Sequence, residues 1–254
     1  VILMIGDGMG FNTLEATKKL KNVNLVMETM PVCSQSETRS LTNKVTDSAA
    51  GGTALACGVR TYNGAIGVFA FNPFANNWQY PVSLSEFAIE RGKAAGVVTT
   101  DETSGATPSA FSAHAIARTS ERNISYDQME SDLTLVWGCA SDSVTAEKCA
   151  ENGFDYFTTR AEMNALPEGS RSFGQFNWDD VAAVKDDNDT PYIAEMTEKA
   201  IDLLDDDEDG FFLMVEGAHI DKFSHSNDFN GSTAHTAEFD KRIRNNAIRL
   251  GSLA

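Results

Sequence analysis

The sequence predicts a doubly wound α/β fold, in which one mostly parallel central sheet carries helices on both faces. Short, largely apolar runs at residues 1–5, 95–100 and 211–215 are typical of buried parallel strands. Segments with helix caps or helical spacing alternate with these runs along the chain. With 254 residues and 42% hydrophobic content the chain can bury a sizeable core, so we predict a single domain over residues 1–254.

Two capping patterns mark helices in the first hundred residues. We expect a helix to start near Asn12, with Glu15 three residues later completing a box-like cap. Ser83 and Glu86 form a fuller capping box before another helix, and Gly92 ends that helix. Both helices lie between the first two predicted strands, as the alternation of an α/β fold requires.

Three further helices are predicted in the rest of the chain. Pro108 suits the first turn of a helix over residues 108–118. Apolar side chains recur at helical spacing over residues 193–203, which predicts an amphipathic helix before the strand at residues 211–215. A last helix covers residues 234–250.

The negative net charge of the chain disfavours some classes of binding partner. The chain has 37 acidic and 20 basic residues and a formal charge of −17, which disfavours nucleic acid and anionic membrane surfaces. A phosphate substrate would also be repelled unless bound cations reverse the local field. No apolar run reaches the length of a membrane span. The four cysteines lack the paired spacing of a zinc site, and a disulfide between Cys139 and Cys149 stays open at this point.

Polar residues gather where the predicted strands end, which is where doubly wound folds bind ligands. Asp7 follows the first strand, Thr107 comes after the second, and Glu216 follows the third, with Asp221 and His225 a few residues later. The oxygen donors of Asp7, Thr107 and Glu216 suit Mg²⁺, whereas the carboxylate and imidazole of Asp221 and His225 suit Zn²⁺. Singly, an Asp in a glycine turn or a lone His is more often structural, so their joint placement carries the prediction.

Ser48 is the candidate nucleophile. It follows Asp47 and precedes small residues that begin a helix, so we expect its hydroxyl to face outward beside the positive helix end. That is a favourable place to attack an anion. The alternative is that Asp47 or Ser48 is merely an N-cap, which is the commoner role of an isolated Asp-Ser pair before a helix.

Several longer segments occur in an order that resembles one known family. They cover residues 5–10, 45–50, 58–67, 106–118 and 211–222. These segments resemble the alkaline phosphatases, particularly the bacterial periplasmic type. The resemblance implies a metal-dependent hydrolase of small phosphate monoesters that uses two zinc ions and one magnesium ion. It also implies a homodimer that is periplasmic or secreted.

The same resemblance gives the catalytic candidates their roles. It implies that Ser48 is a nucleophile that contacts zinc and forms a phosphoserine intermediate. Arg118 matches the arginine that grips two phosphate oxygens in a fork, with Asp47 helping to orient it. Lys222 matches a group that reaches phosphate through water. Without the resemblance, Arg118 would be interpreted as an exposed cation at a helix end.

The metal candidates are matched in the same way. In the family Asp7 bridges the second zinc and the magnesium, and Thr107 and Glu216 complete the protein ligands of the magnesium. Asp221 and His225 match two ligands of the first zinc.

Two features depart from the family's pattern. Gly105 stands where the family has a side chain, commonly Asp or His, beside the magnesium site, which alters the surroundings of that metal. The later Asp-His pair and the further histidine that complete the zinc sites are also missing, and we do not assign His235 to the missing position. The four histidines are His114, His219, His225 and His235. We therefore expect a C-terminally incomplete version of a longer enzyme, whose residues 245–254 need not follow the family's sequence.

Other functions fit the sequence less well. Residues 205–216 fit the EF-hand calcium-loop pattern, but the apolar run 211–215 suits a buried strand and no helix directly follows Glu216. The glycine turn at residues 6–10 resembles a dinucleotide-binding turn, but Phe11 replaces its third glycine. A related metal-dependent sulfatase, phosphodiesterase or mutase is less favoured, because the formylglycine-type Cys-x-Pro-x-Arg pattern is absent. An inactive truncated homologue is the remaining alternative.

Overall fold

A parallel sheet organises the part of the chain that the computed structural model describes, residues 1–183 and 189–251. Within these residues the sheet has six strands in the order β1-β6-β2-β3-β5-β4, and every neighbouring pair is parallel. The strands are β1 (Ile2–Gly6), β2 (Ala94–Glu102), β3 (Leu135–Cys139), β4 (Asp155–Phe157), β5 (Ser172–Phe176) and β6 (Phe211–Gly217). The predicted doubly wound α/β class is confirmed.

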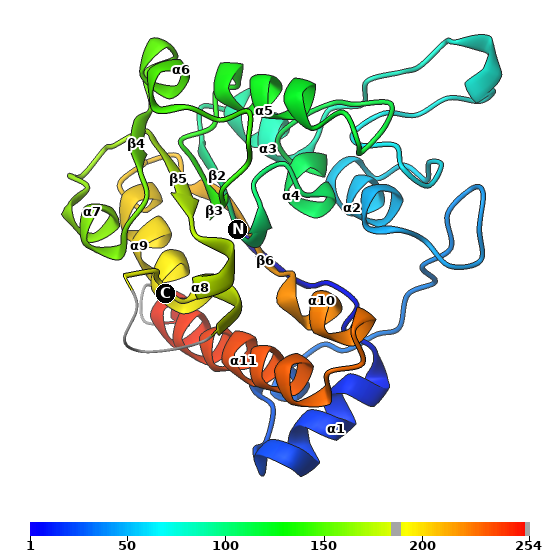
Figure 1. The fold of residues 1–254 in the computed structure, drawn as a ribbon, viewed down its shortest axis with the longest axis vertical. Helices are drawn as coiled ribbons and strands as arrows, with labels where there is room; N and C mark the ends of the chain where they lie inside the picture. Colours follow the sequence, from blue (N-terminus) through cyan, green and yellow to red (C-terminus); the bar gives the residue numbers. More distant parts are fainter. Residues whose placement is uncertain (184–188, 252–254) are drawn as a thin grey trace.

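Helices cover both faces of the sheet (Figure 1). One face packs against α7 (Arg160–Ala165), α8 (Trp178–Ala183), α9 (Ile193–Leu204) and α11 (Phe229–Gly251). The other face packs against α2 (Ser48–Cys57), α3 (Leu84–Ile89), α4 (Ala106–Ala110), α5 (Glu121–Glu130) and α6 (Ala146–Glu151). Beyond these layers lie α1 (Phe11–Lys21), α10 (His219–His225), and the short 3₁₀ helices η1 (Val26–Thr29) and η2 (Pro73–Ala75).

Each strand supplies both cores because neighbouring side chains point to opposite faces. In β2, Val98 belongs to the cluster that contains Trp137 and Met196, whereas Val97 packs with Phe173 on the other face. All five side chains are fully buried. Strands buried on two faces need continuous apolar sequence, which is why β1, β2 and β6 are visible in the sequence. Burying one such large side chain stabilises the fold by about 1.5–3 kcal/mol.

Several predicted helices are confirmed. Ser83 and Glu86 form the reciprocal capping box of α3, and Gly92 follows that helix with a φ of +74°. Helix α9 begins at Ile193 as predicted. Helix α11 begins at Phe229, earlier than the predicted residue 234, because the Asp228 carboxylate accepts a hydrogen bond from the Gly231 N–H at 3.0 Å.

Two local predictions were wrong. Helix α1 starts at Phe11, as expected near Asn12, but the predicted cap is absent: the helix follows Gly10 without a side-chain cap, and Glu15 forms an ion pair with Lys18 at 2.6 Å. Helix α4 ends at Ala110 and does not continue to residue 118.

The segment after α4 is extended because its backbone pairs with another loop. Ala115 forms an antiparallel bridge with Ile66, and the Arg118 N–H donates to the Gly64 carbonyl at 2.7 Å. These contacts replace the hydrogen bonds that a continued helix would make.

The EF-hand interpretation is ruled out by the position of Glu216. This residue lies in β6, hydrogen-bonded between β1 and β2, and its side chain is fully buried. The acidic residues before the strand have a turn role instead: the Asp207 carboxylate accepts hydrogen bonds from the N–H groups of Ala94 and Asp209 at 2.8 and 2.9 Å.

The cysteines are free. Cys139 and Cys149 do not form a disulfide because they are buried on opposite faces of the sheet, in the two separate cores.

Candidate active site

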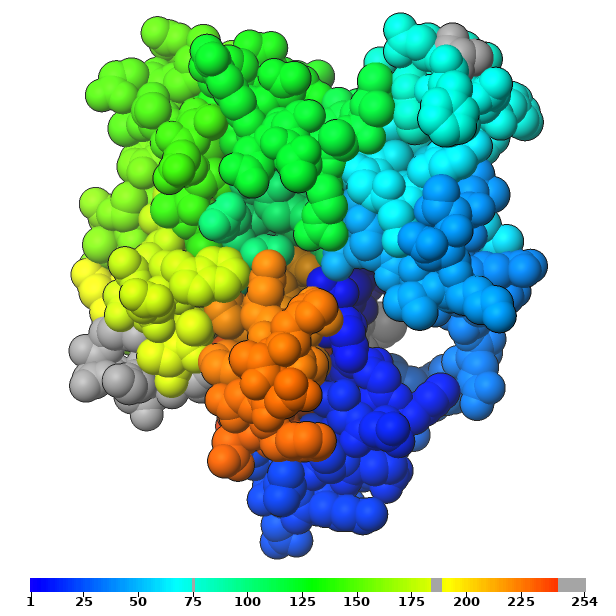
Figure 2. Space-filling view, turned by 45° about the vertical axis from the view of Figure 1, so that its right-hand side comes forward, coloured from blue at the N-terminus to red at the C-terminus, as the bar shows by residue number. Residues whose placement is uncertain are grey.

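The carboxyl edge of β1, β6 and β2 gathers the predicted polar residues. In the strand register Ile5 and Thr99 both lie beside Glu216, so Asp7 and Glu216 emerge at the same edge. The space-filling view shows the orange segment of α10 against the blue N-terminal segment, with light blue and green segments above them (Figure 2). The sequence therefore brings residues from both ends of the chain to one place.

Ser48 lies in the first turn of α2, and its hydroxyl is directed to Asp7. Its Oγ donates to Asp7 Oδ2 at 2.8 Å. Asp47 is the N-cap and accepts the Ala50 N–H at 2.9 Å, so the N-cap alternative describes Asp47 and not Ser48. Gly52 brings α2 close to α4, because a Cβ at this position would lie 3.0 Å from the Ala110 Cβ. Small residues thus hold the helix of Ser48, the candidate nucleophile, against the helix of Thr107.

Arg118 is oriented by Asp47. Its Nη1 lies 3.5 Å from Asp47 Oδ2, and the same oxygen accepts the Gly64 N–H at 2.8 Å. The Arg118 side chain is 39% exposed, so its remaining donors are accessible to an anion. A planar guanidinium beside the N-terminus of α2 suits two oxygens of a phosphate group.

The loop before Arg118 is held by a histidine that the sequence did not single out. His114 Nδ1 lies 2.5 Å from the Gly67 carbonyl and its Nε2 lies 3.0 Å from Glu86 Oε1. Because both nitrogens face acceptors, the ring is best satisfied as an imidazolium. The hydrogen bond with Glu86 raises the pKa of His114, and the same contact lowers the pKa of Glu86 to about 2.

Glu216 is a fully buried carboxylate with an unfilled acceptor. The Thr99 hydroxyl donates to its Oε2, but its Oε1 has no hydrogen-bond partner within the described residues. Burial and then the charges of Asp101 and Asp7 raise the pKa of Glu216 well above its usual range, although the nearby hydroxyls of Thr99 and Thr107 oppose this. A positive ion at this edge would relieve both the repulsion and the unfilled acceptor.

Asp7 also lies close to other negatively charged carboxylates. Burial raises its pKa, as do the charges of Asp221 and Asp101, while the hydrogen bond from Ser48 opposes the change. The turn after β1 allows this crowding because Gly8 has a φ of +62°, and a Cβ there would collide with the Asp221 carboxylate. The glycine turn thus presents Asp7 to Ser48 and Asp221.

Lys222 lies beside a carboxylate that the sequence did not single out. Its Nζ is 3.1 Å from Asp101 Oδ1 and 5.4 Å from the centre of the Trp178 ring. Burial lowers the pKa of Lys222, but the charges of Asp101 and Glu216 outweigh burial and raise it.

Asp221 and His225, the predicted zinc ligands, lie next to each other, and His225 is exposed to solvent. His225 Nε2 lies 3.2 Å from Asp221 Oδ2, four residues apart on α10, and the His225 side chain is 79% exposed. Within residues 1–183 and 189–251, no group of three His, Cys, Asp or Glu side chains is arranged to hold a metal ion. Two donors do not close a zinc site, which has three or four protein ligands.

The remaining histidines form an aromatic stack away from these donors. His219 is 1% exposed, and its ring lies 4.8 Å from Trp178 and 5.1 Å from His235. Burial lowers the pKa of His219 to about 3. His235 Nε2 lies 3.2 Å from the Ala182 carbonyl oxygen.

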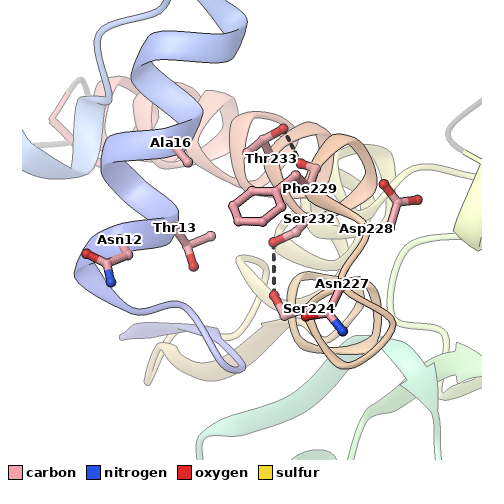
Figure 3. Close-up of a pocket in the computed structure, with 9 residues that line it drawn as sticks. All are labelled: Asn12, Thr13, Ala16, Ser224, Asn227, Asp228, Phe229, Ser232 and Thr233. Carbon is pink, nitrogen blue, oxygen red and sulfur yellow. Dashed lines mark hydrogen bonds between the residues drawn. The ribbon is translucent and has the colours of Figure 1, made fainter.

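A cavity of about 210 Å³ lies between α1 and the turn joining α10 to α11 (Figure 3). No candidate catalytic or metal residue lines it. Its lining consists of Asn12, Thr13, Ala16, Ser224, Asn227, Asp228, Phe229, Ser232 and Thr233.

Comparison with known proteins identifies the family. The alkaline phosphatase family model matches residues 1–141 and 127–252. Alkaline phosphatase 4 of Bacillus subtilis is 34% identical over 96% of this chain. The chain belongs to the alkaline phosphatase family. The resemblance found in the sequence is therefore confirmed.

Other alkaline phosphatases are similar to this chain in sequence and in fold. The Escherichia coli enzyme is 30% identical, with 96% of this chain and 65% of that protein aligned. The cold-active Shewanella alkaline phosphatase structure is 29% identical with a TM-score of 0.85, covering 98% of this chain and 64% of that one. The alkaline phosphatase of the Antarctic bacterium TAB5 is 30% identical with a TM-score of 0.81, covering 99% and 74%. The chain spans only 56% of the Bacillus subtilis relative.

Proposed function

We propose that this chain hydrolyses phosphate monoesters through a phosphoserine intermediate on Ser48. The observation that carries the proposal is the 2.8 Å hydrogen bond from Ser48 Oγ to Asp7 Oδ2 at the N-terminus of α2, next to the Asp47–Arg118 pair. This arrangement combines a nucleophile, an acceptor for its proton and a cation for the substrate. Membership of the alkaline phosphatase family supports the same reaction class.

The reaction can be written on these residues. Ser48 Oγ attacks phosphorus while the bond from phosphorus to the ester oxygen breaks. The Ser48 proton passes by way of Asp7 Oδ2 to the ester oxygen, so the alcohol leaves and phosphoserine forms. Water then attacks phosphorus, a proton of that water passes to Ser48 Oγ as its bond to phosphorus breaks, and inorganic phosphate leaves. Asp7 Oδ2 accepts the hydrogen bond of the Ser48 hydroxyl before attack, and Arg118 binds two nonbridging phosphate oxygens. Asp47 keeps the guanidinium in place, and Lys222 contributes a second positive charge.

The donors present fit magnesium better than zinc. Asp7, Thr107 and Glu216 supply hard oxygen atoms, and the buried Glu216 Oε1 lacks a partner in the described part of the chain. Asp221 and His225, with Asp7 and Ser48, would contribute to two zinc ions, whose ligand sets are only partly present. When bound, the three metal ions would stabilise negative charge on the reacting oxygen atoms and lower the pKa of a water molecule. A TAB5 alkaline phosphatase variant has been solved with Mg bound in its M3 site.

We further propose a homodimer that acts on small phosphate monoesters in the periplasm or outside the cell. No helix in the described residues is both long and apolar enough to cross a bilayer. A sulfatase or phosphodiesterase is the weaker alternative, since the relatives named above are alkaline phosphatases.

The test is hydrolysis of a chromogenic aryl phosphate at alkaline pH, by metal-stripped protein before and after Zn²⁺ and Mg²⁺ are added. We expect metal-dependent turnover that is lost in Ser48→Ala, and mass spectrometry after acid quenching should find phosphate on the peptide containing Ser48. Ser131→Ala is the matched control, because Ser131 precedes β3 at the opposite edge of the sheet. Full turnover by Ser48→Ala would exclude this serine as the nucleophile, and no turnover by the metal-loaded wild type would identify an inactive homologue.

A further inference from the structure

The space beside Gly105 is already filled by a side chain from another element. A Cβ at residue 105 would lie 2.5 Å from Asp101 Oδ2 and 2.7 Å from its Cγ. Carbon atoms do not approach oxygen this closely without a bond. Position 105 therefore cannot carry a side chain while Asp101 keeps its place, and the carboxylate reaches this space from β2 instead.

Asp101 is buried there, and one of its carboxylate oxygens has two partners. It is 7% exposed, although it stands at the end of a strand. Its Oδ1 pairs with Lys222 Nζ at 3.1 Å and accepts the Glu102 N–H at 3.0 Å. A buried carboxylate with a charged partner and a backbone donor has a defined orientation, unlike an exposed ion pair.

A short chain of hydrogen bonds connects Asp101 to the unfilled acceptor. The Asp101 N–H donates to Thr99 Oγ1 at 2.8 Å, and the Thr99 hydroxyl donates to Glu216 Oε2. The other oxygen of Glu216 is buried and has no partner in the described residues. The backbone of Asp101 is thus linked to Glu216 through Thr99, and its side chain holds Lys222.

We propose that Asp101 takes over the function of the missing side chain at position 105: it positions Lys222 and, through Thr99, Glu216 around the site of a divalent cation. Asp101 is a positioning residue, because its contacts are with protein groups. The inference rests on the proposed function, since it concerns the same metal edge and the same phosphate site. It explains how the chain tolerates glycine at position 105 beside a cluster of carboxylates.

The geometry provides a reciprocal test. In Asp101→Ala the carboxylate is lost and the space beside residue 105 becomes free. In Gly105→Asp the new side chain meets the Asp101 carboxylate, both sterically and as a like charge. In the double variant Asp101→Ala/Gly105→Asp, one carboxylate again occupies the space, so the second substitution should repair the first.

Two readouts separate positioning from a general loss of structure. The affinity for Mn²⁺, used as a spectroscopic substitute for Mg²⁺, is measured by electron paramagnetic resonance on metal-stripped protein. KM and kcat for an aryl phosphate are measured on the metal-loaded protein. We expect each single variant to bind Mn²⁺ at least tenfold more weakly with a raised KM, and the double variant to recover at least half of the loss on a logarithmic scale. Asp101→Asn, which retains the shape and loses the charge, should raise KM without changing the urea midpoint appreciably.

The outcomes distinguish this inference from the function on which it rests. A double variant no better than the weaker single variant would overturn the exchange of carboxylates, as would an Asp101→Asn protein with wild-type KM and Mn²⁺ affinity. Wild-type protein that neither binds Mn²⁺ nor hydrolyses the aryl phosphate would overturn the proposed function and this inference together. Recovery in the double variant, with active wild type, supports both.

Discussion

Replacing His114 with glutamine should lower the free energy of unfolding by about 2 kcal/mol near pH 6. The imidazole makes two contacts, to the Gly67 carbonyl at 2.5 Å and to Glu86 at 3.0 Å. We assign about 1 kcal/mol to the hydrogen bond with the carbonyl. The lowering of the pKa of Glu86 from 4.5 to about 2, in which the hydrogen bond with His114 is the largest cause, corresponds to about 3 kcal/mol. Because the Glu86 side chain is 45% exposed, solvent screening reduces this contribution to about 1 kcal/mol.

The effect should depend on pH in a defined direction. The pKa of His114 is raised in the folded protein, so its contribution is complete below the unfolded value of about 6.5 and is lost as the pH rises through the folded value. The pKa of Glu86 is lowered, so its contribution is present above an unfolded value of about 4.3 and is lost as the pH falls towards about 2. The pair therefore stabilises the fold most between about pH 4.5 and 6.5. Asp127, whose carboxylate accepts the backbone N–H of His114, also favours the charged ring through its negative charge.

Urea unfolding of the wild type and His114→Gln at pH 6 and pH 10 measures this difference directly. We expect the gap in unfolding free energy to shrink from about 2 to about 1 kcal/mol at the higher pH, as the ring loses its proton. Glu86→Gln is the matched control, since it removes the charge and leaves the contact between His114 and Gly67 intact. An equal gap at both pH values would refute the ion pair as the source of the stability.

Two further substitutions test other contacts. Arg118→Ala should weaken inhibition by inorganic phosphate by about 2–3 kcal/mol, equivalent to roughly 30- to 150-fold, because a charged donor to phosphate is lost. Arg118→Lys should recover only part of this affinity. Unchanged inhibition in Arg118→Ala would show that Arg118 does not bind the phosphate. Asp240→Ala should lower the free energy of unfolding by about 2–3 kcal/mol, since its buried carboxylate accepts the N–H groups of Val26 and Met27 at 2.8 and 2.9 Å. Thermal unfolding checks this, with the exposed Lys241→Ala as the control, and equal melting temperatures for the two variants would contradict it.

The sequence revealed the helices that have their own capping residues and the strands whose side chains are apolar along their whole length. Strand β6 is buried along its whole length and its sequence is continuously apolar, so it is recognisable. Strand β5 carries Ser172 and Gln175 in its buried positions, which disguises it. Both polar groups are satisfied by distant partners: Trp137 donates to the Ser172 hydroxyl at 3.1 Å, and the Ser141 N–H donates to Gln175 at 2.8 Å. Tertiary contacts of this kind leave no periodic signal in the sequence.

In the candidate site, too, the sequence predicts some residues and misses others. Asp7 and Glu216 could be predicted to lie together because each follows a strand and parallel strands share an edge. Asp101 was missed although it directly follows the predicted strand end at residue 100, because β2 continues to Glu102 and keeps this carboxylate within the strand. His114 and Glu86 are 28 residues apart and meet only because the chain after α4 is extended. A sequence pattern cannot report such a pairing.

The strand order also determines when the site can form. Of the described strands β6 comes last in sequence, yet it lies between β1 and β2, and among these strands β1 pairs only with β6. Residues 2–6 therefore join the sheet only when residues 211–217 are in place. Such contacts between distant parts of a chain form late in folding, because the intervening loop must close first. Asp7 and Glu216 stand at the ends of this pair, so closing the sheet and bringing these two carboxylates together are one event. A nascent chain that stops before β6 contains the Ser48 helix but has no edge against which Ser48 can react.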